Sequence, residues 1–116
     1  MTDPAAVANA YVRAWLGKDF GTLRGLLADD VTFSGPFAEL DNAEDCLKGL
    51  QQLAEIVTDI VVREQLADAT DVITWFDLHT TEAPPVPTAN WSHVENGKIT
   101  SIRVTFDPRP LLPPGQ

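Results

Sequence analysis

The chain has 116 residues, a length that fits one domain with a buried hydrophobic core, and its 44% apolar and 22% charged residues are ordinary for a folded protein. Its net charge of −9 argues against binding to nucleic acid or to an anionic membrane surface, because phosphate groups would be repelled. No run approaches the roughly 18 apolar residues of a membrane span. The N-terminus lacks a signal peptide pattern, and the single cysteine, Cys46, suits a reducing compartment, so we expect a cytoplasmic protein with Cys46 as a small buried residue.

A first helix is predicted from Pro4 to about Leu16. Val7, Tyr11 and Trp15 recur at i, i+4 and i+8, which places all three on one apolar face. A phenol on such a face carries its hydroxyl toward the interior, where a hydroxyl without a partner costs about 1–3 kcal/mol. The Tyr11 hydroxyl must therefore either reach a fixed partner or open into a cavity.

Two further helices and a short strand are predicted next. Asp19 is expected to cap a shorter helix that ends near residue 28, where acidic residues stop it. The segment 31–37 is typical of a short strand, interrupted by a Gly-Pro dipeptide near its end. Asn42 then caps a third helix, whose apolar stripe extends to Val57.

The second half of the chain is rich in β-forming residues. Predicted strands cover residues 58–68, 71–81, 88–95 and 98–106, with a hairpin turn at Asn96-Gly97 between the last two. The proline-dense segment 83–87 is predicted as a connection rather than a central strand, and the tail 108–116 as extended.

This order predicts a single α+β domain over residues 1–116. Three N-terminal helices would cover one face of a curved antiparallel sheet, in the order α-α-β-α-β-β-β-β. Because so few elements need not close fully around a curved sheet, we expect a pocket between the first helix and the concave face.

Two stretches, AYVRAWLGKDFGTLRGLLADDVTF and NWSHVENGKITSIRVTFDPRPL, carry a family likeness. Over about residues 4–110 the chain resembles the nuclear transport factor 2-like superfamily, most closely SnoaL-like polyketide cyclases and ketosteroid isomerases. The resemblance implies a cone-shaped fold with an apolar cavity open at one end, and a homodimer formed through the outer face of the sheet. These motifs are specific for the fold rather than for an activity, since the fold serves enzymes, binding modules and scaffolds.

The resemblance also implies roles for particular residues. Ketosteroid isomerases use a carboxylate base, while a tyrosine and a neutral carboxylic acid donate hydrogen bonds to the enolate oxygen. The tyrosine falls on Tyr11, and the acid falls on Asn90, whose amide can also donate. The base falls on Gly35, which cannot accept a proton, so ketosteroid isomerase activity by the family mechanism is not expected.

Asp77 and His79 are candidates for acid–base chemistry. They lie two residues apart in a predicted strand and so share one face. A carboxylate beside an imidazole can move a proton, and SnoaL-like cyclases use such groups at their pocket. Alternatively, Phe76 and Leu78 take the buried face and turn Asp77 and His79 outward, which simple hydrophobicity favours.

The remaining strands supply candidates for the pocket wall. On strand 88–95, Ser92 and Val94 are expected inward with Asn90, and Trp91 and His93 outward. The residues predicted to line the pocket are Trp15, Phe33, Ile102, Val104 and Phe106.

Neither a metal site nor a cofactor is predicted. The two histidines lie on separate strands without zinc-ligand spacing, and the sequence has no phosphate-binding glycine motif. The first functional hypothesis is a protein that binds a small apolar ligand without catalysis. The second is a cyclase or isomerase for a ketone-bearing polyketide or steroid, with Tyr11 and Asn90 as oxyanion donors and Asp77 or His79 moving the proton. A structural alternative remains for the first pair, in which Asn90 satisfies the Tyr11 hydroxyl in the empty protein.

Overall fold

The structure is a computed structural model that describes residues 3–112. Within that range, three helices and six strands precede a short 3-10 helix, η1. The helices are α1 (Pro4–Leu16), α2 (Phe20–Leu26) and α3 (Ala43–Ala54). The strands are β1 (Leu27–Ser34), β2 (Glu39–Leu40), β3 (Val57–Ala67), β4 (Asp71–Thr80), β5 (Val86–Glu95) and β6 (Lys98–Phe106), and η1 covers Arg109–Leu111.

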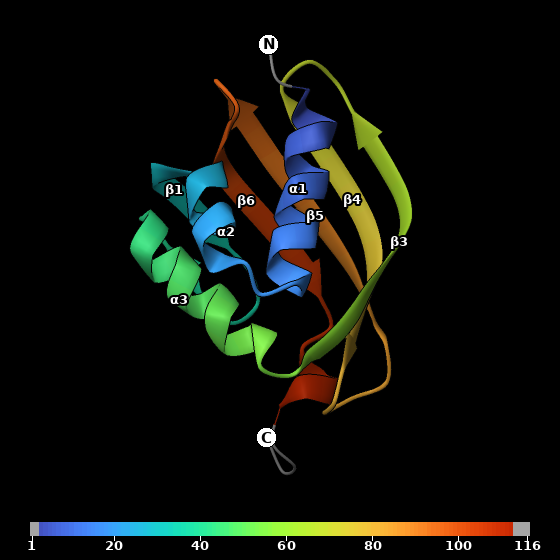
Figure 1. The fold of residues 1–116 in the computed structure, drawn as a ribbon. Coiled ribbons are helices and arrows are strands. Elements are labelled where there is room, and N and C mark those ends of the chain that lie inside the picture. Colours follow the sequence, from blue (N-terminus) through green and yellow to red (C-terminus); the bar gives the residue numbers. More distant parts are fainter. Residues whose placement is uncertain (1–2, 113–116) are drawn as a thin grey trace.

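One curved sheet forms the body of the molecule, with strand order β2-β1-β6-β5-β4-β3. All three helices lie on one face of this sheet, as Figure 1 shows. The predicted α+β architecture is therefore confirmed. None of the helices in residues 3–112 is long and apolar enough to cross a membrane.

Each helix begins at a side chain that caps it. The Asp3 carboxylate accepts a hydrogen bond from a backbone N–H of α1, and the Asp19 carboxylate accepts one in α2. The side-chain oxygen of Asn42 accepts the backbone N–H of Asp45 at 2.8 Å. These caps satisfy N–H groups that have no partner within the helix, which is why local sequence located the starts correctly.

The predicted ends of two helices were wrong. Helix α2 ends at Leu26, and β1 begins at Leu27, four residues before the predicted strand. Helix α3 ends at Ala54, and Val57, which was assigned to its stripe, begins β3. Leu27 is almost fully buried and pairs with Ile99 of β6, so sheet pairing overrides the helical pattern there.

The sheet is mixed rather than antiparallel throughout. Strand β1 pairs parallel with β6, whereas the remaining neighbouring strands pair antiparallel. Strand β2, which the sequence did not predict, returns antiparallel on β1 through a turn closed by the Gly35 N–H donating to the Ala38 carbonyl at 3.0 Å. The parallel pair is formed by the first and last long strands of the chain, and local sequence carries no signal for it.

Two further boundaries differ from prediction. Strand β5 begins inside the proline-dense connection, so Pro87 lies in a strand between β4 and β6, opposite Asp77. The tail is not extended over its first part, because residues 109–111 form η1, and the Arg109 guanidinium binds the Asp107 carboxylate at 2.7 Å. Residues 113–116 of the predicted tail lie outside the described residues.

The core lies between the helices and the concave face of the sheet. On β4, the inward side chains of Val72, Phe76 and Leu78 are buried, while Ile73 and Trp75 are exposed on the outer face. Further buried side chains come from the helices and from β5 and β6, including Val7, Leu23, Leu50, Val94 and Ile99. The helices thus cover one side of the sheet and leave the other side open.

Candidate functional site

A cavity of about 410 Å³ lies between the helices and the inner face of the sheet. It occupies one end of the sheet, where the second half of α1, the N-terminal part of β5 and the last residues of β6 meet. Much of its wall is aromatic, formed by Tyr11, Trp15, Phe33, Phe37, Phe76 and Phe106. Aliphatic side chains from α3 and the sheet complete it, among them Leu50, Leu53, Leu78 and Val104.

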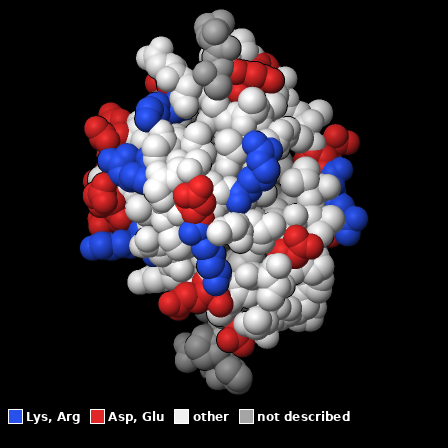
Figure 2. Space-filling view, in the orientation of Figure 1, with Lys and Arg blue, Asp and Glu red and all other residues white. Residues whose placement is uncertain are grey.

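The cavity wall is lined by apolar and uncharged polar side chains. Among the described residues that line it there is no Asp, Glu, Lys, Arg or His. Its polar side chains are Tyr11, Cys46, Gln52 and Thr88. The charged residues lie instead on the surface, and on the face shown in Figure 2 Lys and Arg do not gather into a continuous patch.

Tyr11 is the polar group best placed to meet a ligand. Its side chain is buried, and no hydrogen bond joins its hydroxyl to another residue in the described part of the chain. Every fully enclosed side-chain nitrogen or oxygen among residues 3–112 does have a partner. The unpartnered Tyr11 hydroxyl is therefore not enclosed by protein, and it opens into the cavity that its side chain lines.

Electrostatics keep the polar groups of the wall uncharged. Burial raises the pKa of the Tyr11 phenol well above its ordinary value, and the neighbouring Cys46 adds to this shift. Burial also raises the pKa of the Cys46 thiol to about 11. At neutral pH Tyr11 is thus a hydrogen-bond donor, and Cys46 is a neutral thiol rather than a nucleophilic thiolate.

Trp15 links α1 to α3 at the cavity wall. Its indole N–H donates a hydrogen bond of 2.8 Å to the backbone oxygen of Leu50 in α3. Trp15 lies one helical turn beyond Tyr11 in α1, so the same bond holds Tyr11 in place opposite α3.

Asn90 is not brought to Tyr11. It lies on the inner side of β5, opposite Thr74 and Val104, but outside the cavity wall, where Thr88 takes the place on β5. The Asn90 side-chain oxygen accepts a hydrogen bond from the Ser92 hydroxyl at 3.0 Å. No hydrogen bond joins Tyr11 to Asn90 in the described residues. The alternative in which Asn90 satisfies the Tyr11 hydroxyl in the empty protein is therefore wrong as well.

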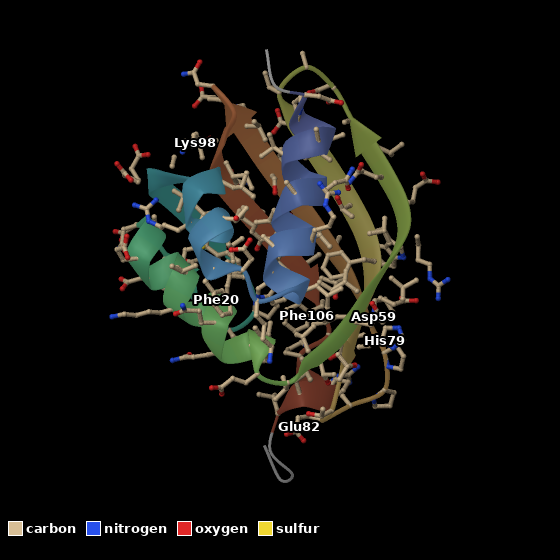
Figure 3. The ribbon with its side chains drawn as sticks, viewed as in Figure 1. Phe20, Asp59, His79, Glu82, Lys98 and Phe106 are labelled. Carbon is tan, nitrogen blue, oxygen red and sulfur yellow. The ribbon has the colours of Figure 1, made fainter. Side chains whose placement is uncertain are left out.

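Asp77 and His79 lie on the outer face of the sheet. Phe76 and Leu78 take the inner face, so the alternation of β4 turns their neighbours outward, as simple hydrophobicity favoured. The Asp77 carboxylate binds the Arg63 guanidinium at 2.8 Å. His79 lies opposite Asp59 of β3, and Figure 3 shows that these two residues lie at the β3–β4 edge. Neither Asp77 nor His79 belongs to the cavity wall.

Four of the five residues predicted to line the pocket do line it, and Ile102 does not. Trp15, Phe33, Val104 and Phe106 line the cavity. Ile102 is buried in the core and reaches a separate shallow groove beside β1 and β2 instead. On β5, Ser92 and Val94 are buried and Trp91 is exposed on the outer face, as expected. In the described residues no cluster of three or more His, Cys, Asp or Glu side chains is placed to hold a metal ion.

Sequence reasoning missed several wall residues. Cys46 and Leu50 lie one turn apart in α3, and their spacing marks the buried face of that helix but not the cavity itself. Phe76 was placed on the inner face in one of the two alternatives for its strand, but it was not predicted to line the cavity. The sequence did not indicate that Phe37 lines the cavity, because Phe37 lies in the turn between β1 and β2 rather than in a periodic element.

Phe37 marks the mouth of the cavity. Its side chain lines the cavity and is nevertheless 52% exposed, so it must lie where the cavity meets solvent. It packs edge-on against Phe106, with ring centroids 5.4 Å apart. The closed turn between β1 and β2 holds it there, since the Gly35 N–H is bonded to the Ala38 carbonyl.

Gly35, at the predicted position of the family base, is part of the cavity wall. A Cβ atom at this residue would lie 3.2 Å from the ring of Phe33 and 3.7 Å from the Cβ of Val104. Both neighbours line the cavity, so a side chain at residue 35 would project into its wall. As a glycine, residue 35 contributes no group to the wall that can accept a proton.

Comparisons with known proteins agree with this architecture. Residues 8–102 match the SnoaL-like domain family. A protein from Kribbella flavida is 30% identical, and the alignment covers 96% of this chain and 92% of that one, with a TM-score of 0.90. No curated protein matches the sequence.

Two more distant structures share the fold. An NTF2-like protein from Cytophaga hutchinsonii is 23% identical over 96% of each chain, with a TM-score of 0.85. A protein with a ketosteroid isomerase-like fold from Catenulispora acidiphila, in complex with trimethylamine, is 20% identical over 89% of this chain and 85% of that one, with a TM-score of 0.71.

Proposed function

The chain belongs to the SnoaL-like family, as its resemblance predicted, and on that basis we propose that it binds a small apolar molecule in the cavity without catalysing a reaction. The observation that carries this proposal is the composition of the wall. Aromatic and aliphatic side chains surround one unpartnered hydroxyl, that of Tyr11, and no described wall residue is an acid or base able to move a proton near neutral pH. General acid–base catalysis requires such a group within hydrogen-bond reach of the reacting proton.

The test is the binding of naphthol to the purified protein, measured by calorimetric titration. We expect saturable binding at one site. Val104→Phe adds bulk to the wall and should weaken binding at least tenfold. Thr105→Phe adds the same bulk to the next residue of β6, on the outer face, and should leave binding unchanged. Absence of saturable binding, or equal loss in both variants, would contradict the proposal.

The alternative function is that of a cyclase or isomerase acting on a ketone-bearing polyketide or steroid. One observation supports it, because the Tyr11 hydroxyl faces the cavity and could donate to a carbonyl oxygen. The second donor and the base are not supported, since Asn90, Asp77 and His79 all lie outside the cavity wall. Turnover of such a ketone that disappears in Tyr11→Phe would favour this alternative.

We also propose that two copies of the chain pair through the outer face of the sheet. Exposed apolar side chains run across neighbouring strands there, with Leu66 opposite Ile73 and Ile73 opposite Trp91. Trp75 is exposed on the same face. A contiguous apolar patch of this kind is typical of an interface. Sedimentation should show a dimer that Trp75→Lys dissociates and that Phe37→Lys, at an equally exposed aromatic elsewhere, leaves intact.

A further inference from the structure

We propose that the cavity selects the uncharged form of an aromatic alcohol or ketone and excludes its conjugate anion. This inference rests on the proposed binding function and names the ligand class. It gives the site the opposite preference to an oxyanion hole, which would hold the anion more tightly than the neutral molecule.

The first reason is the lack of a countercharge. An anion transferred from water into an apolar site must be paired or fully hydrogen-bonded, or its burial is costly. No described residue of the wall carries a positive charge. The net charge of −9 over the whole chain adds a general repulsion.

The second reason is the balance of donors and acceptors. The Tyr11 hydroxyl is a free donor, but the Thr88 hydroxyl already donates to the backbone oxygen of Val86 at 3.0 Å. Thr88 can therefore only accept from a ligand. The Cys46 thiol is a weak donor. The Gln52 amide can also donate, but Gln52 is exposed, so its amide is hydrated at the rim of the cavity rather than held within it. An anionic oxygen needs two or three strong donors, whereas a neutral hydroxyl or carbonyl is satisfied by one donor, with or without an acceptor.

The amide donor implied by the family likeness is absent from the wall. Asn90 lies outside the cavity, and its side-chain oxygen is held by the Ser92 hydroxyl. The wall instead offers flat faces, from Trp15, Phe33 and Phe76 among others, that suit an aromatic ring. Ring stacking therefore supplies most of the contact, and Tyr11 orients one oxygen.

The titratable groups of the cavity do not change charge near neutral pH. Tyr11 from α1 and Cys46 from α3 are the titratable groups that face it, and both stay protonated there. The described wall residues of β1, β4, β5 and β6 contribute no titratable group. A change in affinity around neutral pH must therefore come from the ligand.

The experiment compares pentafluorophenol, an acidic phenol that ionises below neutral pH, with pentafluoroanisole, its methyl ether, which carries no charge at any pH. Binding to the full chain is followed by fluorine NMR from mildly acidic to mildly alkaline pH. We expect the affinity for the phenol to fall about tenfold for each pH unit above the pKa of the ligand, because only the neutral form binds. The ether should bind equally well throughout.

Tyr11→Phe adds a control for the hydrogen bond. We expect it to weaken both ligands about fivefold at low pH, while the slope of affinity against pH for the phenol stays unchanged. Affinity for the phenol that is constant or rises through its pKa, with the ether still bound, would overturn the inference and leave the binding function standing. If neither the ether nor naphthalene binds at any pH, the binding function itself fails, and the inference fails with it.

Discussion

The indole N–H of Trp15 donates to the backbone oxygen of Leu50 across 2.8 Å, and this buried bond joins α1 to α3 at the cavity wall. Trp15→Phe removes the donor together with the five-membered ring of the indole, so the Leu50 oxygen loses its partner and the buried side chain loses packing. We expect the free energy of unfolding to fall by at least about 1–3 kcal/mol. Urea denaturation measures the change. Lys48→Ala, at an exposed residue of α3 outside the cavity wall, should change it by less than about 0.5 kcal/mol. Equal effects in the two variants would show that the Trp15 bond does not stabilise the fold.

The chain contains a single tyrosine, so near-ultraviolet absorbance reports the ionisation of Tyr11 directly. Burial raises its pKa, and we expect no tyrosinate signal in the folded protein near pH 10, about where an ordinary tyrosine titrates. The signal should return to about that pH in urea. A normal titration of the folded protein would mean that Tyr11 is open to bulk water rather than to an apolar cavity.

The same shift predicts how stability depends on pH. Because the pKa of folded Tyr11 lies above that of the unfolded chain, its contribution to stability is complete below about pH 10 and decreases as the pH rises further, when the unfolded state releases its proton first. Urea unfolding midpoints for the wild type and Tyr11→Phe measure this. The loss of stability above about pH 10 should be smaller in Tyr11→Phe than in the wild type. Identical dependence of stability on pH in the two proteins would contradict the attribution of this loss to Tyr11.

Gly35→Asp should place a carboxylate in the cavity wall. The new Cβ would lie 3.2 Å from the Phe33 ring, so that ring must shift slightly, and we expect a loss of about 1–2 kcal/mol in stability. A carboxylate there can accept a proton, and slow isomerisation of an unsaturated ketone should become measurable. The asparagine of Gly35→Asn has about the same size as the aspartate but cannot serve as the base. This variant should therefore be as stable as Gly35→Asp and have no isomerase activity. Equal activity in both variants would exclude a role for the carboxylate.

Phe37 is expected to control the rate at which ligand enters and leaves. Its ring stands at the mouth and packs on Phe106, so Phe37→Ala should raise the association and dissociation rates of naphthol about equally. The equilibrium affinity should change by less than about threefold, because the deep wall is untouched. Stopped-flow fluorescence separates the two rates. A large rise in the dissociation rate alone would show that Phe37 stabilises the bound ligand rather than controlling its passage through the mouth.

Much of the fold follows from local sequence. The caps at Asp3, Asp19 and Asn42 are side-chain to backbone bonds within three residues. Hydrophobicity favoured the face of β4 that carries Phe76 and Leu78 as the buried one without deciding it, and the structure buries that face. The parallel pairing of β1 with β6 could not be found in this way, because it depends on the path of the whole chain.

The site was only partly predictable, because periodicity gives the face on which a residue lies but not its position along the strand or within a turn. The helical spacing of Tyr11 and Trp15 predicted a shared apolar face, and both residues line the cavity. For Asn90, alternation gives the face of the sheet but not the depth along the strand, and the cavity wall takes Thr88 instead. Phe37 lies in a turn, where no periodicity indicates the direction of a side chain.

We propose that the cavity holds an apolar ligand whose one oxygen accepts a hydrogen bond from the Tyr11 hydroxyl. Calorimetric titration of the wild type and Tyr11→Phe with naphthol and with naphthalene measures the contribution of that hydrogen bond. We predict one binding site for each ligand, an affinity for naphthol that falls about fivefold in Tyr11→Phe, and an affinity for naphthalene that does not change. No saturable binding, or an unchanged affinity for naphthol in Tyr11→Phe, would contradict this binding mode.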